Sequence, residues 1–277
     1  ARLLRETVPE PGSPKALMAF YQMTLADMFI RQKRYGEAIE PLNDALGLTS
    51  GKRSKYRLTY LLAQLYERTG DSQGAISNYR KVVKMNPPYE VEFNARINIA
   101  GVFDVNSGDP AEILKELEKM LKDSKNYEFR DQIYFAIGNL MKKEGREEEA
   151  LEYYRKSAAA VSGNRNQKSR SYLALAEHWY AIPDYIRAGI YYDSTVYFLE
   201  ESYPDYKSLQ TKSQNLNALV THLKVIQTED SLQKVASMSE SERTALIAGI
   251  IAEITKAENE GRTSEYSDRA AIGQYYE

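Results

Sequence analysis

The sequence contains no cysteine and only two histidines among its 277 residues. Without thiols the chain has no disulfide, no thiolate nucleophile and no zinc site that depends on sulfur ligands. His178 and His222 fall on different predicted helices, which leaves little material for a metal site or a histidine general base. We therefore predict a protein that is not an enzyme, with no catalytic residue, no metal and no cofactor.

Long apolar runs and a strong charge excess are also missing. A membrane-spanning helix needs about 18 or more consecutive apolar residues, and no such run occurs. The first residues, 1–14, lack the apolar block of a signal peptide. The 37 basic and 39 acidic residues give a formal net charge of -2. No overall field draws the chain to nucleic acid or to anionic lipid, and we expect neither as a direct partner.

What the sequence does contain is a repeat. A marker residue, usually alanine, is followed four positions later by leucine or tyrosine, and this pair occurs five times. The markers are Ala38, Ala75, Ile113, Ala150 and Ala188, spaced by 37, 38, 37 and 38 residues. Their partners are Leu42, Tyr79, Leu117, Tyr154 and Tyr192. Upstream of each marker, an apolar residue, a small residue and a later large apolar residue recur as Leu25-Ala26-Phe29, Leu62-Ala63-Tyr66, Ile99-Ala100-Phe103, Ile137-Gly138-Met141 and Leu175-Ala176-Trp179.

This pattern resembles the tetratricopeptide repeat, in which small residues allow two helices to approach closely and aromatic residues fill the groove toward the next hairpin. The third unit departs from the pattern, with Ile113 where alanine is usual and one extra residue within 106–109. The resemblance predicts an all-α, right-handed solenoid of helical hairpins, because a single hairpin cannot bury its own apolar stripe. We place the repeat array at 1–204, with hairpins near 16–48, 54–86, 91–122, 129–160 and 168–202.

Helix ends agree with this division of the chain. Gly70 and Gly145 stand just beyond predicted helices, and Asp109-Pro110-Ala111-Glu112 has the pattern of an N-cap, a first-turn proline and a capping-box acid. After the array, 205–258 is predicted to form capping helices, the first over 206–227 and the second from the capping box at 239–242. We expect 259–277 to be the flexible end of a longer protein.

The concave face of such an array is lined by the first helix of each hairpin. The candidate partner-binding residues at these positions are Tyr60, Gln64, Arg68, Asn98, Phe135, Asn139, Lys143, Arg170, Glu177 and Tyr180. Aromatic, amide and charged groups of both signs suit an extended peptide or a helix held in a groove. A solvated surface without a ligand would carry the same residues, and both interpretations stay open. The lysine, asparagine and arginine clamp of tetratricopeptide co-chaperones is absent here apart from Asn98.

The segment from Ala188 to Glu253 carries a closer resemblance. The runs 191–195, 203–206, 216–220, 230–233 and 238–243 are similar to the PorW/SprE family, the tetratricopeptide lipoproteins of the Bacteroidetes type IX secretion and gliding machinery. The resemblance implies a protein on the periplasmic side of the outer membrane that links the trans-envelope core to the translocon. Its partners would be secretion-machinery subunits. Membrane attachment would require a lipid anchor upstream of this fragment.

Two other hypotheses remain open. The chain could be a soluble cytosolic tetratricopeptide co-chaperone or regulatory module, which a cytosolic N-terminus in the full-length protein would support. It could also be the targeting domain of an enzyme that continues beyond Glu277. In each case we expect the fragment itself to be an elongated monomer, because every hairpin contacts only its neighbours.

Overall fold

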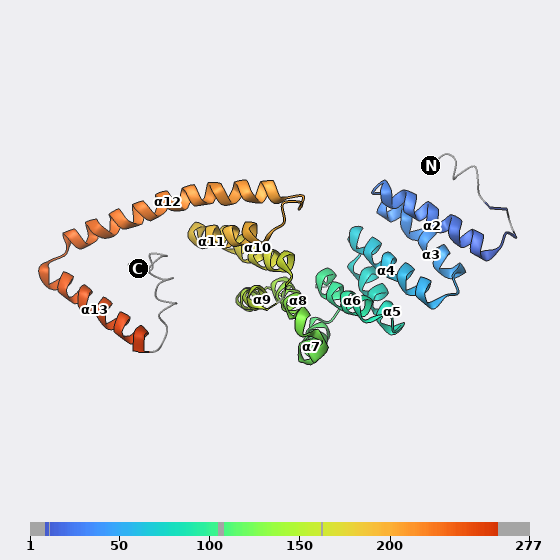
Figure 1. The fold of residues 1–277 in the computed structure, drawn as a ribbon, viewed down its shortest axis with the longest axis horizontal. Coiled ribbons are helices and arrows are strands. Elements are labelled where there is room, and N and C mark those ends of the chain that lie inside the picture. The colour runs from blue at the N-terminus through green and yellow to red at the C-terminus, as the bar shows by residue number, and fades with distance from the viewer. Residues whose placement is uncertain (1–8, 11, 105–107, 162, 260–277) are drawn as a thin grey trace. The chain divides into compact units, whose positions relative to one another are not determined.

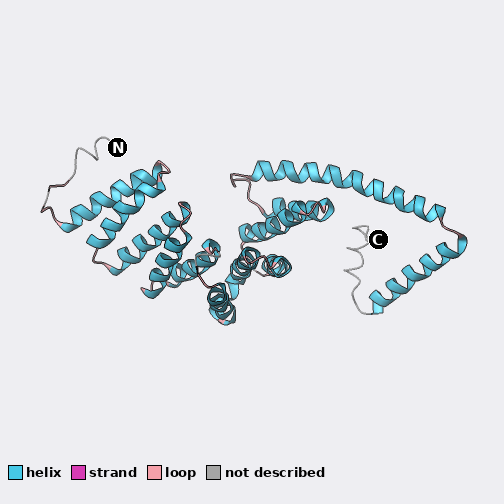
Figure 2. Ribbon diagram, turned by 180° about the vertical axis from the view of Figure 1, so that it is seen from behind, coloured by secondary structure: helices cyan, strands magenta, loops and turns pink. Residues whose placement is uncertain are grey.

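The structure is a computed structural model that describes residues 9–10, 12–104, 108–161 and 163–259. Within these ranges every regular element is a helix, as Figure 2 shows, so the predicted all-α class is confirmed. Two compact units divide the chain, Ala1–Ser162 and Gly163–Glu277. The extra residue of the third repeat was predicted within 106–109, and 106–107 lie outside the described residues. Of the predicted flexible end at 259–277, 260–277 lie outside them as well.

Unit 1 consists of helical hairpins in which consecutive helices lie side by side (Figure 1). The pairs are α2 (Lys15–Arg31) with α3 (Tyr35–Leu48), α4 (Lys52–Arg68) with α5 (Ser72–Lys84), α6 (Tyr89–Val102) with α7 (Pro110–Lys122), and α8 (Arg130–Lys143) with α9 (Glu147–Ala159). A 3₁₀ segment, η1 (Ser124–Phe129), joins α7 to α8. The two helices of the third pair, α6 and α7, contact each other over fewer residues than those of any other pair.

Unit 2 begins with one more hairpin, α10 (Arg165–Ala181) and α11 (Tyr185–Phe198). Helix α12 (Tyr206–Ser237) packs on α11, and α13 (Glu240–Asn259) follows it. The core of the unit joins Ala176, Ala188, Tyr192 and Leu216, which come from α10, α11 and α12. The compact units divide at 162/163. The predicted boundaries at 204/205 and 258/259 stay predictions.

The repeat register accounts for the buried core. All five markers and all five residues four positions later are at most 2% exposed. Gly138, the small residue of the upstream motif in the fourth unit, shows why that motif position is small: a Cβ atom built there would lie 2.7 Å from Cε1 of Tyr154 and 3.3 Å from the backbone oxygen of Ala150. Close approach of the two helices of a hairpin therefore depends on the small residue, as the sequence predicted.

The predicted helix ends are confirmed in most details. Gly70 and Gly145 have positive φ angles of 80° and 74°, a backbone region that glycine enters without a steric penalty. The Asp109 carboxylate accepts a bond from the backbone N–H of Ala111 at 2.9 Å. Glu112 does not complete this cap, because its carboxylate pairs with Arg80 at 2.6 Å.

Helix α12 differs from its predicted length. The sequence predicted an end at Gln227, whereas the helix continues to Ser237. No glycine or proline interrupts the chain between these residues, so nothing in the backbone favours an earlier end. The predicted capping box is confirmed: the backbone N–H of Ser239 donates to the Glu242 carboxylate at 2.7 Å and starts α13.

Candidate functional site

The predicted groove residues lie on the first helix of each hairpin. Tyr60, Gln64 and Arg68 are on α4, Asn98 is on α6, Phe135, Asn139 and Lys143 are on α8, and Arg170, Glu177 and Tyr180 are on α10. The α4, α6 and α8 residues belong to unit 1, and the α10 residues belong to unit 2. Within unit 1 the structure shows how these side chains are used, and it separates them into two groups.

One group forms a polar network that links consecutive hairpins. The side-chain amide of Asn98 donates to the hydroxyl of Tyr60 at 2.9 Å and to that of Tyr79 at 3.2 Å. Tyr79 in turn donates to the Glu67 carboxylate at 3.0 Å. The rings of Tyr60 and Tyr79 meet edge to face with centroids 5.3 Å apart. Burial raises the pKa of both tyrosines, so each keeps the proton that the network requires.

Lys143 of α8 also has a structural role, at the C-terminal end of α6. Its ammonium donates to the backbone oxygen of Phe103 at 2.7 Å and also to that of Gly101. The last carbonyl groups of a helix lack partners within the helix, and this lysine from α8 supplies one. Burial lowers the pKa of Lys143, while the charges of Asp104 and Glu67 oppose that shift. The side chain thus ties the third hairpin to the fourth.

Asn139 and Phe135 are also engaged inside the chain. The Tyr154 hydroxyl donates to the side-chain oxygen of Asn139 at 2.9 Å, and the Phe135 ring lies 5.5 Å from the Tyr154 ring. Gln64 and Arg68 form the other group: both are exposed, and no described hydrogen bond or ion pair within the chain engages their side chains. A binding role for the ten residues stays a prediction, and Gln64 and Arg68 are the unit 1 members best placed to test it.

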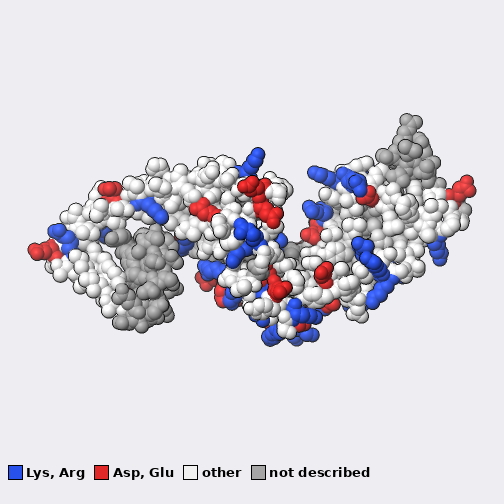
Figure 3. All heavy atoms as spheres, in the orientation of Figure 1, with Lys and Arg blue, Asp and Glu red and all other residues white. Residues whose placement is uncertain are grey.

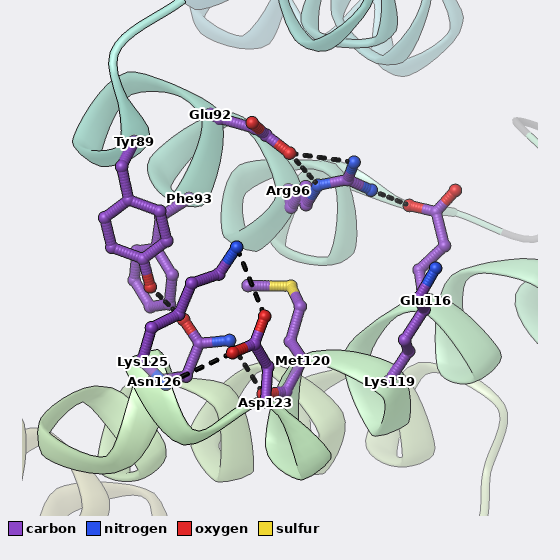
Figure 4. A pocket seen from close by; sticks show the side chains of 10 residues that line it. All are labelled: Tyr89, Glu92, Phe93, Arg96, Glu116, Lys119, Met120, Asp123, Lys125 and Asn126. Carbon is purple, nitrogen blue, oxygen red and sulfur yellow. Dashed lines mark hydrogen bonds and ion pairs between the residues drawn. The ribbon is translucent and has the colours of Figure 1, made fainter. Parts of the chain in front are cut away.

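A cleft that the sequence did not reveal opens within the third hairpin (Figure 4). Its volume is about 430 Å³, and it lies between α6 on one side and α7 with η1 on the other. The lining consists of Tyr89, Glu92, Phe93, Arg96, Glu116, Lys119, Met120, Asp123, Lys125 and Asn126. None of these residues was among the predicted groove positions.

The cleft combines an aromatic end with a charged end. Phe93 lies against Phe129 with ring centroids 5.1 Å apart, and the Tyr89 ring is 6.0 Å from that of Phe93. At the charged end Arg96 bridges Glu92 at 3.0 Å and Glu116 at 3.3 Å, which joins α6 to α7. Figure 4 shows Arg96 reaching across to Glu116.

Lys125 lies beside the aromatic end of this cleft. Its ammonium pairs with the Asp123 carboxylate at 3.2 Å and lies 5.1 Å from the centre of the Tyr89 ring. A bond from the backbone N–H of Lys125 is the main cause that lowers the pKa of Asp123. Tyr89 donates its hydroxyl hydrogen to Asn126, whose amide donates at 2.7 Å to the backbone oxygen of Met120. The polar groups of η1 are thereby fixed at the rim.

The sequence contained one signal for this cleft. Ile113 replaces alanine at the marker position of the third repeat, and it is 2% exposed. A side chain as large as isoleucine, at a position where two helices would otherwise approach closely, requires the helices to lie farther apart. The reduced contact between α6 and α7 agrees with this. The departure from the repeat pattern marks the hairpin that opens.

Other kinds of site receive no support from the described residues. No group of three or more histidine, aspartate or glutamate side chains among them is arranged to hold a metal ion. None of the described helices combines the length and the hydropathy required to cross a membrane. On the face drawn in Figure 3, basic and acidic side chains are intermixed over both units, in keeping with the near-neutral composition.

The comparisons agree with the fold. Residues 56–89 and 131–160 match the tetratricopeptide repeat family, and they coincide with the second and fourth hairpins. The chain thus has the all-helical solenoid fold of tetratricopeptide proteins and is a protein-binding scaffold.

Among solved structures, "Crystal Structure of Rap Protein Complexed with Competence and Sporulation Factor" is similar to the chain with a TM-score of 0.53. The two are 17% identical over 99% of this chain and 79% of that chain, so the likeness concerns the fold alone. A comparison with curated proteins gave no match.

Proposed function

We propose that the chain is a non-enzymatic adaptor that holds an extended segment of a partner protein in the cleft between α6 and α7. The observation that carries this proposal is the lining of the cleft, where an aromatic end and charges of both signs lie within one opening. An apolar anchor beside charged groups is the arrangement that concentrates binding energy in protein interfaces. Tyr89 and Arg96 are of the residue types that dominate such hot spots.

One exposed lysine of the cleft, Lys119, offers a direct test with a matched control. Lys119 and Lys115 are both exposed on α7 and lie one turn apart, but only Lys119 lines the cleft. Lys119→Glu should weaken binding of a partner titrated by calorimetry, whereas Lys115→Glu should leave it unchanged. Equal effects of the two variants would show that general charge, rather than the cleft, attracts the partner.

The finer proposal concerns the biological setting. We assign the chain to the periplasmic side of the outer membrane, as an adaptor between the trans-envelope core and the translocon of type IX secretion. Its support is the resemblance of residues 188–253 to the PorW/SprE lipoproteins. The partners would then be other secretion-machinery subunits, and a purified subunit is the natural titrant in the experiment above.

A deletion strain tests this assignment. Cargo bearing the type IX C-terminal signal should fail to reach the medium and should accumulate in the periplasm, while general export into the periplasm continues. Normal cargo secretion in that strain would refute the secretion role and would favour the cytosolic co-chaperone or regulatory module instead.

A further inference from the structure

Unit 2 contains a second pocket whose chemistry differs from that of the α6/α7 cleft. It has a volume of about 770 Å³ and lies among the end of α10, the start of α11 and the first turns of α12. Two lysines, Lys207 and Lys212, line it, and no acidic residue does. In the α6/α7 cleft, in contrast, Glu92, Glu116 and Asp123 line the opening together with its three cations. The charged groups that line the unit 2 pocket are both positive.

Aromatic rings hold one of the two ammonium groups in place. The Nζ atom of Lys212 lies 3.8 Å from the centre of the Tyr180 ring and 4.6 Å from that of the Tyr192 ring. The two rings stand nearly perpendicular, with centroids 6.3 Å apart. Cation–π contact orients the ammonium but leaves its N–H groups able to donate. Within the described residues no hydrogen bond or ion pair engages the side chain of Lys212 or of Lys207.

The remaining lining provides apolar and neutral polar groups. Leu216 is buried beneath the pocket, and Leu219 is 39% exposed beside it. Thr211 and Asn215 add a hydroxyl and an amide on the exposed side of α12. A ligand for this pocket thus needs negative charge to meet the lysines and an aliphatic group to cover the leucines.

Two lysines in one pocket call for a ligand with two carboxylates. In an extended peptide, side chains two positions apart share a face and are separated by about 6.6 Å. Acidic side chains at alternate positions of an extended segment therefore provide two carboxylates on one face, one for each ammonium group.

We propose that this pocket binds an acidic, extended peptide segment of a partner protein, with carboxylates on Lys207 and Lys212 and an aliphatic side chain on Leu216 and Leu219. The proposal goes beyond the adaptor function in unit 1, because the ligand chemistry is set by α10, α11 and α12 alone. If the secretion role or the binding at the α6/α7 cleft were refuted, the proposal for the unit 2 pocket would still hold. If the unit 2 proposal were refuted, those two proposals would still hold.

The test uses the full chain and a short fluorescent peptide with blocked ends. The peptide carries glutamates at two alternate positions beside leucine, and a control peptide has glutamine in their place. In fluorescence anisotropy the acidic peptide should bind at least about tenfold more tightly than its amide analogue, as expected for charge-assisted hydrogen bonds. Added salt should weaken that binding.

Variants locate the binding on the protein. Lys207→Gln combined with Lys212→Gln should cost about tenfold in affinity through the lost charges. Lys224→Gln, an exposed lysine of α12 outside the lining, should have no effect. Because Lys212 packs on two rings, Lys212→Arg serves as the conservative variant and should retain peptide binding. Lys207→Gln alone should weaken peptide binding without altering the melting temperature.

Three results would overturn the proposal. One is equal affinity for the acidic and the amide peptides, and another is full affinity in the double lysine variant. The third is binding to vesicles of anionic lipid with no binding of the acidic peptide, which would make the pocket a lipid contact.

Discussion

Gly138→Ala tests the close packing on which the hairpins depend. Gly138 lies within α8, where an added Cβ would be 2.7 Å and 2.8 Å from two ring carbons of Tyr154. The ring cannot swing away easily, because Tyr154 is 2% exposed and its hydroxyl bonds to Asn139 at 2.9 Å. The added methyl group must therefore push the backbones of α8 and α9 apart.

Two opposing effects set the magnitude. Replacing glycine by alanine inside a helix gains about 1 kcal/mol of helix propensity. Overpacking of a filled core costs about 1–3 kcal/mol, and a contact below 3.0 Å with an anchored ring belongs at the upper end of that range. We expect a net destabilisation of about 1–2 kcal/mol, or a fall in melting temperature of several degrees.

Urea unfolding followed by circular dichroism measures this difference. Gly47→Ala in α3 is the matched control, since a Cβ at Gly47 would meet nothing within 4 Å. That variant should be neutral or more stable by up to about 1 kcal/mol. If Gly138→Ala proved as stable as Gly47→Ala, the argument that helix contact in the fourth hairpin requires a missing side chain would be wrong.

Further substitutions test other contacts. Ala150→Asp should destabilise unit 1 by about 3 kcal/mol or more in urea unfolding, because it buries a carboxylate at a site 1% exposed, whereas the exposed Glu148→Ala should change little. Lys33→Gly should raise the melting temperature slightly, because Lys33 has a φ angle of 59°, which costs a non-glycine residue about 1 kcal/mol. Tyr79→Phe should lower stability near neutral pH by about 1 kcal/mol through lost hydrogen bonds. The same variant should also lose less stability above about pH 10 than the parent protein. Burial raises the folded-state pKa of Tyr79, so this tyrosine stabilises the fold below its unfolded-state pKa, and that stabilisation is lost as the pH rises above it.

The repeat register was predictable because it depends on local sequence spacing. A small residue at each marker is required wherever two helices approach closely, and Ala75 and Ala150 satisfy that requirement at full burial. Helix ends at Gly70 and Gly145 were predictable for a similar reason, since the positive φ angle is a property of a single residue. Both features can be read without knowing what lies across the interface.

The cleft could not be predicted in the same way. Its lining joins Arg96 of α6 to Glu116 of α7, and whether two such residues meet depends on how the two helices pack. The repeat pattern indicated which repeat is irregular, but it did not predict which side chains would meet there. The end of α12 was missed as well, because amphipathic spacing ceases where a helix leaves its packing partner although the helix itself continues.

Helix α12 is attached to α11 by polar side chains as well as by the apolar core. Asp193 of α11 accepts hydrogen bonds from Ser213 and, at 2.8 Å, from Asn217, both on α12. These contacts hold α12, the helix that carries Lys207 and Lys212, against α11.

The engagement of groove residues within the fold decides how the concave face can be tested. Alanine at Tyr60 or Asn98 would break the network around Tyr79 and lower stability, so a loss of partner binding in such variants could not be attributed to the groove. Gln64→Ala with Arg68→Ala removes two exposed side chains that no described contact within the chain engages. The melting temperature should stay unchanged, while a partner that uses the concave face should lose about 2 kcal/mol of binding free energy if either residue is a hot spot. Unchanged affinity for a partner whose binding Lys119→Glu weakens would place recognition in the α6/α7 cleft and leave the concave face solvated.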